Sequence, residues 1–190
     1  MAKVEDIQHK WAMASLAKDE LFARMPEPDR CRIILEAINF GSHLAKRARE
    51  QLVIPFGPEA IREMLEALGC VVRIDEKSGL PGPMSEYEEG LGAALFFLRR
   101  IRETASIAIE ENKWTKGWYD LYAQCLAREL FHHMEHTLSG KASHHIRFGD
   151  RFLGLVPVSR PVETAREIAC LVFVRDLMGL TEIPLMMRYA

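Results

Sequence analysis

The sequence lacks the features that mark several common protein classes. Its four cysteines are widely spaced, so no CxxC pair exists that could form a zinc or redox motif. No apolar run approaches the roughly 20 residues of a membrane-spanning helix, and the polar first ten residues contain no secretory signal. The GxxxxGK(S/T) phosphate loop, the GxSxG nucleophile elbow and the GxGxxG dinucleotide motif are also missing. These absences predict a cytoplasmic protein with reduced thiols.

The charges nearly balance, with 25 Lys and Arg against 27 Asp and Glu in 190 residues and a net charge of -2. Such a balance favours neither a nucleic-acid partner nor a membrane surface, and we expect neither. With 48% hydrophobic residues, a chain of this length can bury a core without disulfides. An amphipathic first helix (residues 3–24) and an apolar tail (residues 183–187) permit a protein partner or a homodimer.

Hydrophobic periodicity and turn residues predict helices, then a few strands, then helices again. The expected helices span residues 3–24, 30–52, 58–68, 116–138 and 161–178, with Gly41 as a break or bend in the second. The expected strands span residues 70–74, 93–100 and 104–110, although 93–100 suits a helix equally well. Long loops are expected at residues 76–91 and 139–161.

This order of elements predicts an α+β fold. The fold should be mainly helical, with a small three-stranded sheet packed on a central buried helix formed by residues 116–138. We expect an N-terminal helical region over residues 1–53 and a second domain over residues 54–190.

Five of the seven histidines lie between positions 132 and 145, and two of them share a helical stripe. The stripe follows spacings of three and four residues through Trp118, Tyr122, Cys125, Glu129, His132 and His136. Imidazoles at i and i+4, such as those of His132 and His136, can chelate one metal ion because their nitrogens converge. Glu129 could then be a third ligand, a base or a group that orients a ligand. The alternative is that the two histidines are exposed polar residues, or half-buried groups whose hydrogen bonds are satisfied.

The last expected helix carries a second pair of candidates. Glu163 and Glu167 are four residues apart on a face that continues into apolar positions, so either could be the missing metal ligand. The alternative is that both complement the helix dipole near its N-terminus.

Residues 127–136, Ala-Arg-Glu-Leu-Phe-His-His-Met-Glu-His, resemble the AHELGHxxLH core of the ImmA/IrrE family of HExxH metallopeptidases. Residues 55–72 are similar to that family's entry helix and first strand, residues 106–112 to the strand before its active helix, and residues 163–179 to its EAxxFAAxLLMP helix. The resemblance spans roughly residues 41–180 and implies a zincin-like fold, with residues 54–190 as a metallopeptidase-like domain. It also implies zinc bound by two histidines and a downstream glutamate, with the HExxH glutamate as general base.

Carried over residue by residue, the resemblance makes Glu129 the base, His132 the second ligand, and Glu163 or Glu167 the third. Arg128 stands where the family has its first histidine ligand. A guanidinium stays protonated and has no lone pair to donate to zinc, so the family's site cannot form unchanged. Phe131 also replaces the glycine of the family motif.

Three functions remain open at this point. The first is a degenerate, non-catalytic cytoplasmic binding or regulatory protein. The second is an active metal-dependent hydrolase, with zinc held by His132, His136 and a downstream glutamate. The third is a ferritin-like helical metal-binding protein, because Glu129-x-x-His132 followed by later glutamates also occurs in such bundles. A strand count separates the third from the others, and metal analysis separates the first from the second.

Overall fold

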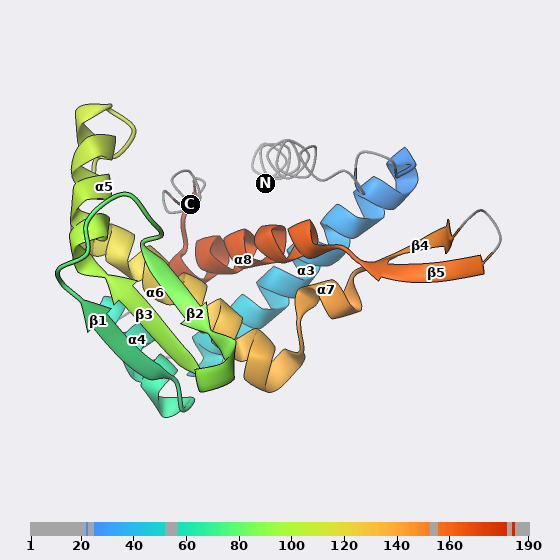
Figure 1. Cartoon of the computed structure of the whole chain (residues 1–190), viewed down its shortest axis with the longest axis horizontal. Helices are drawn as coiled ribbons and strands as arrows, with labels where there is room; N and C mark the ends of the chain where they lie inside the picture. The colour runs from blue at the N-terminus through green and yellow to red at the C-terminus, as the bar shows by residue number, and fades with distance from the viewer. Residues whose placement is uncertain (1–21, 23–24, 52–56, 153–155, 182–183, 185–190) are drawn as a thin grey trace.

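The computed structural model describes residues 22, 25–51, 57–152, 156–181 and 184 of the chain (Figure 1). The first predicted helix and the apolar tail lie almost entirely outside these residues. In chain order the elements are α3 (Glu27–Gln51), α4 (Pro58–Ala67), β1 (Val71–Asp75), β2 (Ser85–Glu88), the 3-10 turn η1 (Glu89–Leu91), β3 (Ala93–Phe97), α5 (Leu98–Glu110), α6 (Trp118–Met134), the π-helical segment η2 (Glu135–Ser139), α7 (Ala142–His145), β4 (Arg147–Phe152), β5 (Val156–Pro161) and α8 (Glu163–Met178).

The fold is α+β and mainly helical, with a small mixed three-stranded sheet, as the sequence predicted. The strand order is β1-β3-β2, in which β1 runs parallel and β2 antiparallel to β3. Ala94 and Phe96 of β3 are fully buried, and the Phe96 ring meets Tyr122 of α6 at a centroid distance of 5.6 Å. A ferritin-like bundle has no such sheet, so the fold does not match that alternative.

One of the three strands was predicted in the wrong place. Residues 104–110 belong to the helix α5, whose buried positions Ile101, Thr104, Ala105 and Ala108 follow helical spacing. Ile107 and Ile109, whose alternation suggested a strand, are both exposed. The third strand is instead β2, within residues 76–91, which were predicted to be a loop. The predicted loop at residues 139–161 likewise contains α7 and the β4–β5 hairpin.

Helices α3 and α8 pack side by side and run in the same direction (Figure 1). At Gly41 the backbones of the two helices come so close that a Cβ atom on this residue would stand 2.2 Å from the carbonyl oxygen of Ala169. The predicted break at Gly41 is therefore wrong. The helix is continuous there, and the glycine instead allows two backbones to meet.

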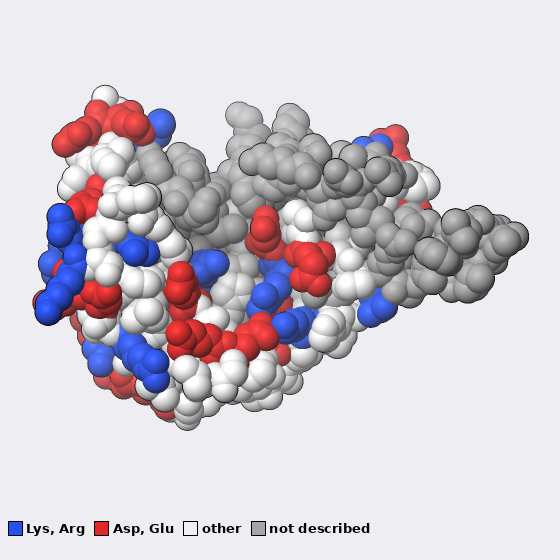
Figure 2. Space-filling view, viewed as in Figure 1, with Lys and Arg blue, Asp and Glu red and all other residues white. Residues whose placement is uncertain are grey.

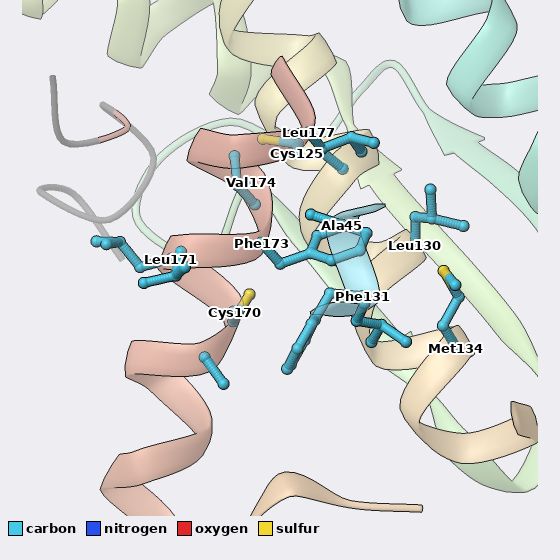
Figure 3. Close-up of a cluster of buried hydrophobic side chains, with 14 of the residues drawn as sticks. Ala45, Cys125, Leu130, Phe131, Met134, Cys170, Leu171, Phe173, Val174 and Leu177 are labelled. Atoms are coloured by element: carbon cyan, nitrogen blue, oxygen red, sulfur yellow. The ribbon is translucent and has the colours of Figure 1, made fainter. Parts of the chain in front are cut away.

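The interior side chains of α3, α6 and α8 form one hydrophobic core. Phe131 of α6 and Phe173 of α8 are completely buried, with ring centroids 5.5 Å apart, and lie among aliphatic side chains of all three helices (Figure 3). Phe131 is thus part of this core. Although α6 and α8 are largely apolar, no helix in the described part of the chain combines the length and apolarity that crossing a membrane requires.

Candidate functional site

Helix α6 carries most of the stripe that the sequence predicted. Tyr122, Cys125 and Glu129 are buried on it, and the His132 side chain is only 13% exposed. The α-helix ends at Met134, however, and His136 lies exposed in the π-helical segment η2. The chelating pair was predicted on one continuous α-helix, whereas a π turn changes the register of the side chains that follow it. The pairing of His132 and His136 as ligands stays a prediction.

Arg128 neutralises the fully buried carboxylate of Glu129. Its Nη1 donates to Glu129 Oε1 at 2.6 Å and to the backbone carbonyl of Ser85 at 3.2 Å. Ser85 Oγ donates to the same carboxylate oxygen at 2.5 Å. Burial works against the guanidinium charge, but the adjacent carboxylate outweighs it and raises the pKa of Arg128. Arg128 therefore supplies a permanent positive charge at Glu129.

The second oxygen of Glu129, Oε2, is buried and has no hydrogen-bond partner among the described residues. Oε1, in contrast, accepts from both Arg128 and Ser85. The carboxylate is thus held from one side only. A general base needs water within reach of its free oxygen, and Glu129 is completely buried.

His133, beside the stripe, is the most buried histidine of α6, with 2% exposure. Its Nε2 lies 3.1 Å from the carbonyl oxygen of Leu68, and its Nδ1 lies 2.9 Å from the hydroxyl of Tyr87. Because a carbonyl only accepts, Nε2–H donates to Leu68; in the neutral imidazole the other nitrogen, Nδ1, then accepts from the phenol. Burial raises the pKa of Tyr87 to about 12, which keeps that phenol protonated. Both ring nitrogens of His133 are therefore occupied.

The ring of Tyr87 also lies against the two histidines that the sequence proposed as ligands. Its centroid is 6.5 Å from that of His132 and 6.3 Å from that of His136. Tyr87 thus connects strand β2 to every histidine of α6 and η2.

A second fully buried carboxylate, Glu135, joins α6 to α8. Arg166 Nε donates to it at 2.7 Å, the Ala142 backbone N–H donates at 2.7 Å, and His132 Nδ1 lies 3.5 Å away. Burial opposes ionisation of this carboxyl group. The hydrogen bonds from His132, Ala142 and Arg166 together outweigh burial and lower the pKa of Glu135.

Glu89, directly after β2, extends this network to the surface. It is 3.3 Å from Arg166 Nη2 and 2.8 Å from Lys141 Nζ, and its pKa is lowered, chiefly by the hydrogen bond from Lys141. Figure 2 shows acidic and basic side chains gathered together over this face of the molecule. The contacts join the end of β2 to α8 and to the segment before α7.

The structure does not bring Glu163 or Glu167 to the other candidate ligands. Both are exposed on α8, while Arg166 between them reaches Glu135. Within the described ranges, no three His, Cys, Asp or Glu side chains are grouped so that they could hold a metal ion. The two buried carboxylates, Glu129 and Glu135, instead form ion pairs with Arg128 and Arg166.

Two buried thiols belong to the helices that carry these charged residues. Burial raises the pKa of Cys125 on α6 and of Cys170 on α8 to about 12 each. Thiols with such values are not nucleophiles near neutral pH, because the thiolate is the reactive form.

Sequence reasoning missed Ser85, Tyr87 and Arg166. The first two had a signal, since Ser85-Glu86-Tyr87-Glu88 alternates with the period of a strand inside the expected loop. Arg166 had none, because its partner Glu135 is distant in sequence and lies just beyond the end of α6.

No protein-family model, no curated protein and no solved structure matches this chain. The resemblance to the ImmA/IrrE metallopeptidases therefore rests on the sequence pattern of residues 127–136 and of the helices around it. Residues 106–112, which were compared with the strand before the family's active helix, lie mostly in the helix α5 instead.

Proposed function

We propose that this chain is a degenerate, non-catalytic relative of the HExxH metallopeptidases, with a zincin-like fold, that acts by binding rather than by cleaving. The observation that carries the proposal is the ion pair between Arg128 and Glu129. In the HExxH arrangement the glutamate activates a metal-bound water. Here an arginine from the first ligand position holds that carboxylate.

The side chains around the two buried carboxylates support loss of the zinc site rather than a zinc site shifted to His132 and His136. Zinc in proteins takes neutral imidazole, thiolate or carboxylate ligands at about 2.0–2.3 Å. Arg128 and Arg166 both carry fixed positive charge toward the buried carboxylates, which electrostatically disfavours a divalent cation beside them. His132, the one ligand of the family set that is present on α6, is directed by Nδ1 toward Glu135.

The free edge of β2 supports an extended peptide as the ligand. The β2–β3 register places the backbone N–H and C=O groups of Ser85 and Tyr87 on the edge away from β3. No strand in the described part of the chain pairs with that edge. An extended peptide could add there as a further strand, a common mode of peptide recognition. The Ser85 carbonyl on that edge already accepts from Arg128, so a peptide that adds there would lie beside this guanidinium.

Metal analysis of the natural protein and of Arg128→His tests the proposal. We expect the natural protein to purify without stoichiometric zinc and to melt at the same temperature with and without chelator. Arg128→His removes the cation, frees Glu129 and restores an imidazole, so it should raise zinc affinity measurably. Arg62→His, on the exposed face of α4, is the matched control and should not change zinc binding.

Two results would contradict the proposal. Stoichiometric zinc in the natural protein, lost in His132→Ala or His136→Ala, would support the shifted metal site instead. Metal-dependent peptidase activity of the natural protein would show that Glu129 still acts as a base.

A further inference from the structure

A pocket of about 420 Å³ lies between the C-terminal halves of α3 and α8, away from the site described above. Its lining includes Ser42, Lys46, Arg49, Arg175, Asp176 and Gly179. The volume is in the range of small-molecule sites. Three cationic side chains against one carboxylate leave this lining with a net charge of +2, in a chain whose overall charge is -2.

Helix periodicity and a glycine build the pocket. Ser42, Lys46 and Arg49 follow i, i+4, i+7 spacing, so one face of α3 presents all three toward the end of α8. Gly179 ends α8 in the left-handed conformation, with φ of 64°. A Cβ at Gly179 would lie 3.3 Å from Arg49 Nη2, so the glycine leaves room for that guanidinium over the helix end.

The carboxylate in the pocket is already engaged. Asp176 Oδ1 accepts from Arg175 Nε at 2.8 Å, and Asp176 Oδ2 accepts from Ser42 Oγ at 2.5 Å. Arg175 is thereby fixed in orientation, and its Nη1 is buried without a hydrogen-bond partner among the described residues. Lys46, in turn, is exposed and has no partner in the described part of the chain.

Hydrogen bonding at the C-terminal end of α8 leaves part of this positive charge without a partner. The carbonyls of Arg175 and Asp176 already accept from the backbone N–H groups of Leu180 and Gly179. The Leu177 carbonyl accepts from Arg49 Nε at 3.1 Å. That bond uses one of the guanidinium nitrogens of Arg49, and it leaves the ammonium of Lys46 unused.

We propose that this pocket binds a small molecule through a phosphate group, which Lys46 and Arg49 hold by charge-assisted hydrogen bonds. Arginine presents a planar fork and lysine a mobile point charge, and this combination suits the several oxygens of a phosphate. Arg175, whose orientation is fixed by its ion pair with Asp176, adds a further positive charge to the pocket lining. The site is independent of the Arg128–Glu129 pair and of the proposed function.

Calorimetric titration of the full chain with inorganic pyrophosphate, at constant ionic strength, tests the proposal. We expect saturable binding with one pyrophosphate per chain. Lys46→Ala should weaken it by roughly tenfold or more, as expected for loss of a charge-assisted hydrogen bond. Lys46→Arg should retain most of the affinity. The matched control Lys77→Ala removes another exposed lysine, far from the pocket in sequence, and should leave binding unchanged.

Absence of saturable binding would overturn the proposal, as would equal affinity of Lys46→Ala and the natural protein. Citrate, a polycarboxylate, is titrated in parallel to test whether the pocket prefers phosphate over other anions. If citrate binds as tightly as pyrophosphate under the same conditions, the assignment to phosphate is wrong. Because Lys46 is exposed, its replacement by Ala should not unfold the chain, and an unchanged melting temperature without ligand verifies this.

Discussion

Arg128 Nη1 lies 2.6 Å from Glu129 Oε1, which joins two consecutive residues of α6 in an ion pair. Glu129 is completely buried and Arg128 is 31% exposed, so one charge of the pair has no access to solvent. The interaction differs in kind from the exposed pairs on α3, α4 and α5. Those contribute little to stability, whereas breaking a buried pair leaves a charge without compensation.

Replacing Arg128 by methionine should therefore destabilise the fold by about 2–4 kcal/mol, because Glu129 loses its counter-charge inside the protein. The double variant Arg128→Met with Glu129→Gln should recover much of the loss, since no buried charge remains. Urea unfolding followed by circular dichroism measures both. Equal stability of Arg128→Met and the natural protein would show that the pair is not energetically significant.

Gly41→Ala should destabilise the protein by about 2–3 kcal/mol, because the added methyl group would overlap the Ala169 carbonyl and force α3 away from α8. Gly90→Ala is the matched control, since a Cβ there meets nothing within 4 Å. Thermal melting distinguishes the two. If both variants melt like the natural protein, the close approach of α3 and α8 at Gly41 is wrong.

Glu135→Gln should lower stability near neutral pH by about 1–2 kcal/mol, because Arg166 loses its charged partner. The folded-state pKa of Glu135 lies below its ordinary value of 4.5, so its ionised form stabilises the fold above about pH 4.5. That contribution is lost as the pH falls through the folded-state pKa. The stability difference between the natural protein and the variant should therefore shrink in acid, as measured by urea unfolding across a pH series.

Glu86→Gln provides the comparison for that series, since Glu86 is exposed on β2. Its stability should follow that of the natural protein at every pH. A constant difference between Glu135→Gln and the natural protein down to about pH 3 would show that Glu135 does not titrate with a lowered pKa.

Three of the four cysteines should resist a thiol reagent at pH 8 in the folded protein. Burial raises the pKa to about 11 for Cys70 and about 12 for Cys125 and Cys170, so almost no thiolate is present. Cys31 is only partly buried and should react first. Absorbance of released thionitrobenzoate should show one accessible thiol, absent in Cys31→Ser, and four after denaturation. Rapid reaction of several thiols in the native state would contradict this burial.

The sequence predicted helices best where apolar spacing and end signals agreed. In α4, Pro58 lies at the start, Ile61, Met64 and Leu65 are buried, and Gly69 follows the end with positive φ. The prediction from sequence failed at α5. Ile107 and Ile109, two exposed residues on either side of an alanine, gave the alternating pattern of a strand. The prediction also missed β2, whose four residues alternate too briefly to stand out within a stretch rich in glycine and proline.

By itself, the sequence determined that Arg128 cannot serve as a metal ligand and that Glu129 and His132 share a helical face, because side-chain chemistry and helix periodicity are local properties. Only the tertiary structure decided what those residues meet. It turned Glu163 and Glu167 to solvent, brought Arg166 to Glu135, and aligned Ser85 and Tyr87 with α6. Such pairings depend on how α8 and β2 pack against α6, and that packing is set by the whole buried core rather than by any local pattern.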